Sequence, residues 1–268
     1  AGTDLDGLAA AFAAAGLATE YGGEHSNGVT HNRVLGFADG SYLELISTLE
    51  PGAESPWWND AIHGDAGPCA WALPVDVDDI ETETERIGSL GVAVEGPDHY
   101  TRERPDGVTI EWDLTEVGDP FGSTLPFLVA DRTPREYRTT ESESVAGTGI
   151  TGIEEVVVCV PDLGPVERFA SFFGADSVAR TTHDSFGADL ARVEGTPVTL
   201  AAPNGSESGG WLRERLDRFG PLPCAYLLGS DDLAATAERV DLREGEPWFG
   251  SEVRWVDLDV PGRVGVLG

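Results

Sequence analysis

The sequence predicts an α+β fold made of four copies of one small unit, each with a helix followed by strands. Three observations indicate this fold: four amphipathic helix patterns, a glycine turn after each of them, and an apolar strand before three of them. Similar segments at a roughly constant spacing are the usual signature of a repeat architecture. We therefore expect tandem βαβββ units, the first without its leading strand.

The four helices are expected to begin near Leu5, Ile80, Leu163 and Leu233. An aspartate precedes each start: Asp4, Asp79, Asp162 and Asp232. A carboxylate at this position can accept a hydrogen bond from a free backbone N–H of the first helical turn. Apolar residues recur at helical spacing, so each helix is expected to bury one stripe.

A hairpin turn that contains glycine follows each helix. The turns are Asp39-Gly40, Asp106-Gly107, Glu194-Gly195 and Pro261-Gly262, and they lie 27 to 35 residues after the helix starts. Glycine supplies the positive φ that such turns often require. The apolar strands expected before the later helices are Cys69 to Val75, Val156 to Val160 and Ala225 to Leu228.

These units divide the chain into two halves. Residues 1–132 hold units 1 and 2, and residues 150–268 hold units 3 and 4. The segment between them, residues 133–149, is polar and poor in apolar residues, which is typical of a linker.

The charge of the chain is strongly negative. Of 268 residues, 48 are Asp or Glu and 17 are basic, which gives a net charge of -31, and every basic residue is Arg. So large a charge repels itself at low salt, whereas molar salt shortens the Debye length to about 3 Å. Because the acidic residues are spread along the whole chain, we expect a protein of a salt-adapted organism rather than one with an acidic patch for a basic partner.

The same composition excludes several classes of function. Nucleic-acid binding is not expected, because phosphate contacts need a cationic surface. No apolar stretch approaches the roughly 20 residues that cross a bilayer, and no signal-peptide pattern opens the chain, so we expect a cytoplasmic protein without a membrane partner. Cys69, Cys159 and Cys224 are isolated in apolar runs, which indicates neither a disulfide framework nor a zinc site.

A strand, a helix and three strands, repeated in pairs, resemble the vicinal-oxygen-chelate superfamily, which includes glyoxalase I, extradiol dioxygenases and bleomycin-resistance proteins. The stretch GGEHSNGVTHNRVLGFADGSYLELI, Gly22 to Ile46, resembles the glyoxalase-like domain in particular. The later stretches TRERPDGVTIEWDL and LPFLV fit the same family. The resemblance implies two halves, each with sheets curled around a shared pocket.

The resemblance also implies metal ligands on the first and last strands of a unit. Four residues beyond the turn glycines lie Glu44, Glu111, Thr199 and Val266. Eight residues before the helix starts lie Ala72, Glu155 and Ala225. We therefore expect no metal in the second half, where His183 is expected on the surface. A divalent metal is compatible with the first half, where Glu44 is the best candidate ligand and the first-strand ligand is missing.

Glu44 and His31 are the candidate catalytic residues. Glu44 interrupts an apolar strand, where a carboxylate is costly to bury unless it is paired or used in a site. His31 could bind a metal or act as a general acid or base, or could simply satisfy backbone groups where the strand begins. If Asp39 and Gly40 form a two-residue loop, Glu44 lies opposite Leu35. His31 then lies four residues from Leu35 on the same face, so both would line one cavity.

Six further residues are candidate substrate-binding groups: Asn32, His25, Arg102, Arg104, Glu111 and Trp112. Each has a structural alternative. Asn32 can satisfy backbone groups where its strand begins, and His25 lies in a glycine-rich loop. The arginines can be surface counter-charges, the Glu111 face can be solvated, and Trp112 can pack in the core. An arginine can also hold an anionic ligand through two hydrogen bonds.

The sequence leaves three functions open. The first is a glyoxalase-like enzyme, of the lyase or isomerase type, that acts on a small carbonyl, hydroxy or aromatic metabolite in the first-half pocket. The second is a non-catalytic small-molecule binding protein of the resistance type, and the third is a structural descendant with closed pockets. We expect a monomer or a homodimer.

Overall fold

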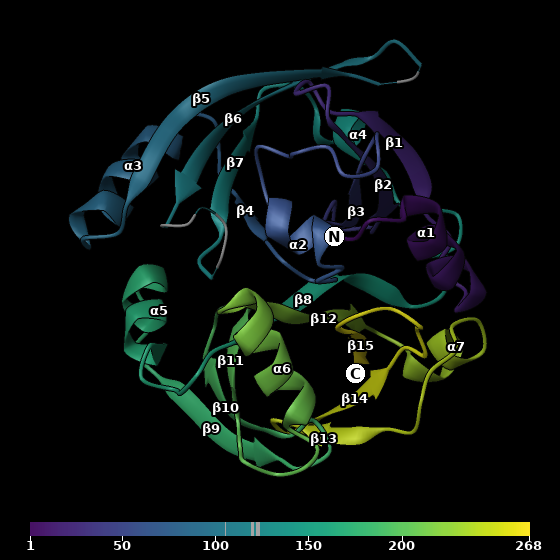
Figure 1. Ribbon diagram of the computed structural model, residues 1–268, viewed down its shortest axis with the longest axis vertical. Helices are drawn as coiled ribbons and strands as arrows, with labels where there is room; N and C mark the ends of the chain where they lie inside the picture. Colours follow the sequence, from purple (N-terminus) through teal and green to yellow (C-terminus); the bar gives the residue numbers. More distant parts are fainter. Residues whose placement is uncertain (105, 119–120, 122–123) are drawn as a thin grey trace.

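The computed structural model describes residues 1–104, 106–118, 121 and 124–268, and it has the mixed α+β architecture predicted from the sequence. In Figure 1 the first half of the chain fills the upper part of the view and the second half the lower part. Pro105, just before the predicted turn at Gly107, lies outside the described residues.

The first unit consists of a helix and a three-stranded antiparallel sheet in the order β1-β2-β3. Its elements are α1 (Leu5–Ala14), β1 (Glu20–Glu24), β2 (Thr30–Gly36) and β3 (Tyr42–Thr48). The short helix α2 (Asn59–His63) follows.

The second unit begins with a strand and forms a separate four-stranded sheet in the order β4-β7-β6-β5, in which β4 runs parallel to β7. Its elements are β4 (Ala72–Pro74), α3 (Ile80–Ser89), β5 (Val94–Glu103), β6 (Thr109–Val117) and β7 (Phe127–Asp131). The short helix α4 (Arg135–Arg138) lies in the predicted linker, whose Val145 is buried.

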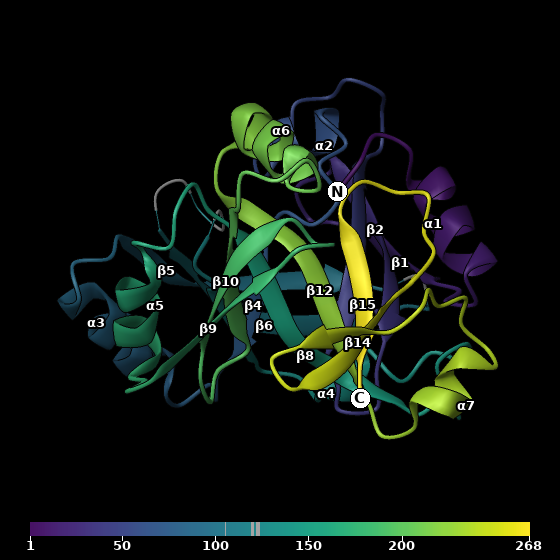
Figure 2. The ribbon, with the colours of Figure 1, turned by 90° about the horizontal axis from the view of Figure 1, so that it is seen from below.

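The second half forms one eight-stranded sheet in the order β13-β14-β15-β12-β8-β11-β10-β9. One group contains β8 (Ile150–Cys159), α5 (Val166–Phe173), β9 (Val178–His183), β10 (Ala188–Val193) and β11 (Val198–Pro203). After α6 (Gly210–Phe219), the other contains β12 (Leu222–Ser230), α7 (Leu233–Ala237), β13 (Glu246–Trp248), β14 (Ser251–Trp255) and β15 (Arg263–Leu267). Strands β8 and β12 pair with each other and so join the two groups, and β15 lies on the other side of β12 (Figure 2).

Two of the four predicted helix caps are present. The side chain of Asp4 accepts a hydrogen bond from the Gly7 N–H, and that of Asp232 caps α7. Asp79 makes no such bond. The fourth prediction was wrong, because α5 begins at Val166 instead of near Leu163. The residue before a proline avoids the helical region, so Gly164-Pro165 delays the helix.

All four predicted turn glycines have positive φ, between 73° and 84°. Three of the turns join the last two strands of a unit, but the turn at Gly107 joins β5 to β6, the first two of the three strands after α3. The last strand of this unit is β7. Glu111 on β6 is therefore not the counterpart of Glu44 on β3, which corrects the equivalence expected from counting.

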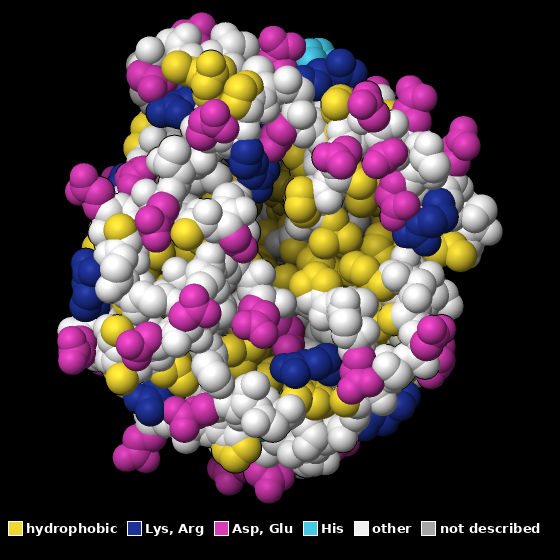
Figure 3. Space-filling model, turned by 180° about the vertical axis from the view of Figure 1, so that it is seen from behind, with side chains coloured by type: hydrophobic (Ala, Val, Ile, Leu, Met, Phe, Trp, Pro, Cys, Tyr) yellow, Lys and Arg dark blue, Asp and Glu magenta, His cyan; other side chains and the backbone are white. Residues whose placement is uncertain are grey.

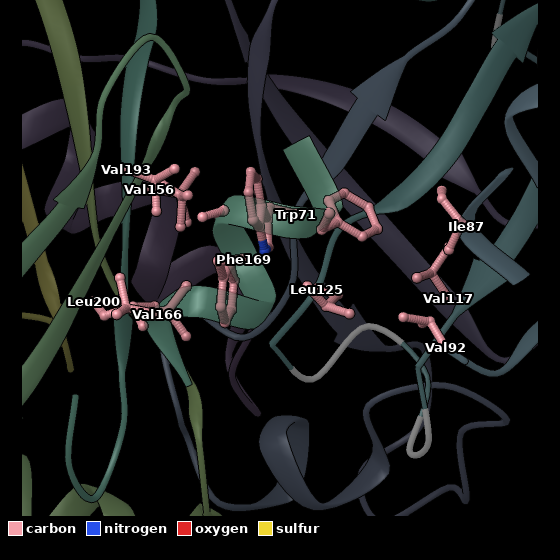
Figure 4. Packing of buried hydrophobic residues seen from close by; sticks show 14 of the residues in the cluster. Trp71, Ile87, Val92, Val117, Leu125, Val156, Val166, Phe169, Val193 and Leu200 are labelled. Atoms are coloured by element: carbon pink, nitrogen blue, oxygen red, sulfur yellow. The ribbon is translucent and has the colours of Figure 1, made fainter. Parts of the chain in front are cut away.

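The two halves pack through the outer faces of their sheets. One buried cluster, shown in Figure 4, joins Trp71, Ile87 and Val117 of the first half to Val156, Val166 and Phe169 of the second. Another joins Phe12, Leu35 and Leu43 to Leu228 and Val264. These clusters leave the inner faces of the first-half sheets free to line a cavity. None of the helices in the described parts of the chain is long and apolar enough to cross a membrane.

Candidate functional site

A cavity of about 90 Å³ lies between the two sheets of the first half. Aromatic side chains supply much of its wall: Tyr42, Trp57, Trp58, Tyr100, Trp112, Phe121 and Phe127. The Tyr100 and Trp112 rings stack 5.9 Å apart at 17°, and the Trp58 and Phe121 rings stack 5.9 Å apart at 29°. Such a wall favours a flat, partly apolar ligand.

Polar groups gather on the same wall, where β2, β3 and β5 face the cavity. Predicted site residues His25, Asn32, Glu44, Arg102 and Trp112 all line it. Nδ2 of Asn32 donates to Oε1 of Glu44 over 2.7 Å, and Nε2 of His25 lies 3.1 Å from the same oxygen. The structure thus brings together five of the eight predicted residues.

The Glu44 carboxylate is ionised. Protein atoms surround the Glu44 side chain on most sides. About 31% of its surface is accessible, on the side that faces the cavity. Burial alone would raise its pKa, but the hydrogen bonds from His25 and Asn32 and the charge of Arg102 outweigh burial and lower the pKa to about 2. Because an ionised carboxylate only accepts hydrogen bonds, Nε2 of His25 carries the proton in this contact. The other ring nitrogen, Nδ1, lies 2.7 Å from Oγ1 of Thr30.

Arg102 is a buried cation, with 8% of its surface exposed. Its Nη1 donates to Oδ1 of Asn32 over 3.2 Å. Among the described residues no carboxylate lies within ion-pair distance of it. Burial lowers the pKa of Arg102, and the nearby Glu44 partly opposes this shift.

His31 does not face this cavity, so the prediction that His31 and Glu44 share it was wrong. The β2–β3 loop has three residues, since Phe37 pairs with Ser41, and this shifts the register by one position. Glu44 pairs with Val34 and His31 pairs with Ser47. A shift of one residue moves every side chain to the opposite face. His31 therefore lies on the other side of β2, where its ring meets Tyr21 edge to face.

Arg104 and Glu111 also lie outside the cavity lining. Arg104 donates to the carbonyl of Tyr137 and to Asp106. Glu111 lies on the face of β6 that points away from the cavity, and its carboxylate lies 3.4 Å from the His99 ring on β5.

Sequence reasoning missed Arg138 and most of the aromatic wall. Arg138 lies in the predicted linker, binds Asp131, and places its guanidinium 4.6 Å over the Trp112 ring. It lines the cavity 36 residues after Arg102, and no spacing pattern in the sequence connects the two. Part of the wall could be identified from the sequence, because tryptophans such as Trp57, Trp58 and Trp112 are candidates for the wall of an apolar pocket.

The residues around Glu44 do not fit the divalent metal that the superfamily resemblance implies. An iron site of the dioxygenase type takes two histidines and one carboxylate. Here Glu44 has one histidine beside it, Asn32 presents its N–H₂ group, and the Arg102 guanidinium follows directly. Within the described ranges, no three side chains of His, Cys, Asp or Glu are placed to hold a metal.

The inner face of the second half is filled by its own side chains. Glu155 accepts a hydrogen bond from Nε1 of Trp248 over 3.0 Å, and Nη2 of Arg192 lies 2.5 Å from its other oxygen. His183, expected on the surface, is instead 7% exposed, because the rings of Trp248 on β13 and of Phe186 pack against it. A wider, open depression of about 400 Å³ elsewhere, lined by Asp4, Asp65 and Asp259 among others, contains none of the candidate residues.

Comparison with known proteins agrees with this architecture. The family model of the glyoxalase-like domain matches residues 1–173, more than half of the chain. The sequence matches no curated protein significantly.

Two solved structures align with nearly the whole chain. A mutant of 4-hydroxymandelate synthase from Streptomyces coelicolor covers 98% of this chain and 88% of its own, with a TM-score of 0.59 and 13% identity. A hypothetical protein from Staphylococcus aureus covers 92% of this chain and 89% of its own, with a TM-score of 0.53 and 12% identity. Identities this low show a likeness of fold alone. The family match shows that the chain belongs to the glyoxalase-like domain family, and its fold agrees with the vicinal-oxygen-chelate architecture expected from the sequence.

Proposed function

We propose that the first-half cavity binds a small planar metabolite that carries an anionic group, and that Arg102 holds this group. One observation supports the proposal most. In a chain with a net charge of -31, the described residues that line one aromatic cavity supply two guanidinium groups and one carboxylate. Arg138 has Asp131 as its partner, which leaves Arg102 as the buried cation available to a ligand.

A ligand carboxylate would compensate the burial of Arg102. An uncompensated buried charge is costly, and a bidentate carboxylate contact is among the strongest interactions that a guanidinium makes. The stacked rings of Tyr100 and Trp112 would hold the planar part of the ligand beside it.

The geometry supports binding better than proton abstraction by Glu44. A general base works best when its pKa lies near the working pH, whereas the pKa of Glu44 is lowered to about 2. Turnover is the second candidate function. It is favoured by the position of His25, because Thr30 contacts one ring nitrogen and Glu44 contacts the other. These two contacts hold the imidazole in one orientation, as a general acid or base requires.

Calorimetry with two matched compounds tests the anion preference. We expect the protein to bind 4-phenylbutanoate at least about tenfold more tightly than 4-phenylbutan-1-ol, because hydrogen bonds to charged groups contribute about 1.5–3 kcal/mol. The variant Arg102→Gln is expected to lose this preference. Arg104→Gln, which removes a nearby guanidinium outside the cavity lining, is the matched control and is expected to keep it.

Two results would contradict the proposal: no saturable binding of either compound, or an anion preference that survives in Arg102→Gln. Time-resolved NMR of the same mixtures separates the two candidate functions, because turnover produces new ligand resonances whereas binding only shifts existing ones.

A further inference from the structure

The two oxygens of Glu44 differ in their hydrogen bonding. Oε1 receives both contacts, from Nδ2 of Asn32 and from Nε2 of His25. Oε2 receives no hydrogen bond from the residues that the structure describes, although the side chain lines the cavity and is about 31% accessible there. An ionised carboxylate can only accept hydrogen bonds, and the Glu44 side chain lines the cavity, so a donor on a ligand there can bind Oε2.

Asn32 fixes the distance between this acceptor and Arg102. Its side chain is 3% exposed, its Oδ1 accepts from Arg102, and its Nδ2 donates to Glu44. Both ends of the amide are committed, so the amide cannot flip without losing both bonds. The Asn32 amide therefore separates the Arg102 guanidinium from the Glu44 carboxylate. The guanidinium needs a hydrogen-bond acceptor on the ligand, and the carboxylate needs a donor.

We propose that the ligand is a carboxylic acid with a hydrogen-bond donor on the carbon next to the carboxylate, namely a 2-hydroxy or 2-amino acid with an aromatic or planar side chain. This inference rests on the anion-binding function proposed above. The ligand carboxylate binds Arg102, the neighbouring hydroxyl or ammonium group donates to Oε2 of Glu44, and the ring lies against Tyr100 and Trp112. Because a single side-chain amide bridges the two protein groups, two ligand groups on adjacent carbons match their spacing.

The same arrangement selects against 2-oxo acids. A keto oxygen in place of the donor would point its lone pairs at the Glu44 carboxylate. Neither oxygen can donate a hydrogen bond, so the keto oxygen and Oε2 of Glu44 would both stay unpaired. Specificity of this kind comes from the mismatch of the wrong ligand as much as from the fit of the right one.

A matched series of four ligands tests the inference by calorimetry: 4-phenylbutanoate and its 2-hydroxy, 2-amino and 2-oxo derivatives. We expect the 2-hydroxy acid, the 2-amino acid or both to bind at least about tenfold more tightly than 4-phenylbutanoate, since a hydrogen bond to a charged acceptor contributes about 1.5–3 kcal/mol. The 2-oxo acid is expected to bind no more tightly than 4-phenylbutanoate. Which donor gives the gain distinguishes a hydroxy acid from an amino acid.

The variant Glu44→Gln sharpens the test, because the described contacts fix how glutamine must sit. Asn32 and His25 both donate to the position of Oε1, so the glutamine carbonyl takes that position and its N–H₂ group takes the position of Oε2. The acceptor becomes a donor, from which a keto or hydroxyl oxygen can accept and an ammonium group cannot. The 2-amino acid is therefore expected to bind more weakly than the 2-oxo acid, and the advantage of the 2-hydroxy acid over the 2-oxo acid is expected to be lost. Glu111→Gln makes the same change outside the cavity lining and is expected to leave the order of affinities unchanged.

The outcomes separate this inference from the proposed function. Equal affinity for all four acids in the wild type, or the same order of affinities in wild type and Glu44→Gln, overturns the adjacent-donor inference and leaves anion binding standing. Failure of all four acids to bind overturns both. A loss of structure in Glu44→Gln would appear in circular dichroism, and the order of the four affinities in the wild type then decides alone.

Discussion

At Glu44, burial and hydrogen bonding act on the pKa in opposite directions, and hydrogen bonding is stronger. The pKa is about 2 in the folded chain, against an ordinary value of 4.5. A carboxyl group whose pKa is lower in the folded state stabilises that state above its unfolded pKa, and the contribution is lost as the pH falls towards the folded pKa. The Glu44 contribution is thus expected to be complete above about pH 5 and to disappear between about pH 4.5 and 2.

Denaturant titrations of wild type and Glu44→Gln at several pH values, in constant molar salt, measure this contribution. The difference in the free energy of unfolding between the two proteins is expected to be constant from about pH 5 to 8 and to shrink on acidification. Using the difference cancels the titration of the many other carboxylates. A difference that stays constant down to pH 2 would show that the carboxylate is not stabilised by its neighbours.

The residues around this carboxylate show what sequence can and cannot predict about a site. Glu44 was identified because a charged group in an apolar strand needs a reason, and that reason does not depend on tertiary structure. The role expected for His31 depended on whether the loop at Gly40 has two residues or three, which the Asp-Gly pair does not settle. Arg138 could not be found, because only the folding of α4 against β6 brings it to the cavity.

Helix α6 is an element that the repeat pattern did not contain, and it ties the two halves together. Arg215 on this helix is 6% exposed, and its guanidinium donates to the carbonyls of Ala66 and Pro68 in the first half and of Pro223 in the second. Its role depends on loops far away in the sequence, so periodicity alone could only indicate a helix. The repeats themselves were predictable because glycine turns and apolar strands are local patterns.

Replacing Arg215 by methionine keeps the aliphatic bulk but leaves these buried carbonyls without a donor. An unsatisfied buried polar group costs about 1–3 kcal/mol, so we expect the free energy of unfolding to fall by roughly 2–5 kcal/mol. Arg213→Met is the control, because Arg213 lies on the exposed face of the same helix and donates to the carbonyl of Ser206. Chemical denaturation at fixed salt compares the two variants. Equal effects of both substitutions would contradict the role assigned to Arg215.

At the scale of the whole molecule, negative charge is spread over a face of the protein instead of being gathered in one patch. Figure 3 shows Asp and Glu side chains scattered over an entire face, with arginines between them. The sequence predicted this spread, because its 48 acidic residues are distributed along the whole chain. Composition does not reveal which carboxylates lie close enough to repel one another. The structure does, and Glu81 and Glu85 on α3 are one such pair.

Salt is expected to stabilise the folded chain by screening this repulsion. At molar ionic strength the Debye length falls to about 3 Å, so only carboxylates in close contact still repel one another. The melting temperature, followed by circular dichroism, is expected to rise between about 0.05 M and 2 M KCl. An uncharged osmolyte at equal osmolality is expected to reproduce only a small part of the rise.

On α3, Glu81 and Glu85 are exposed and four residues apart, a spacing at which like charges destabilise a helix. Replacing both by glutamine should therefore raise the melting temperature at low salt and change it little at high salt. A melting temperature that does not depend on KCl, or a double variant equally stabilised at both salt concentrations, would show that charge repulsion does not limit the stability of this fold.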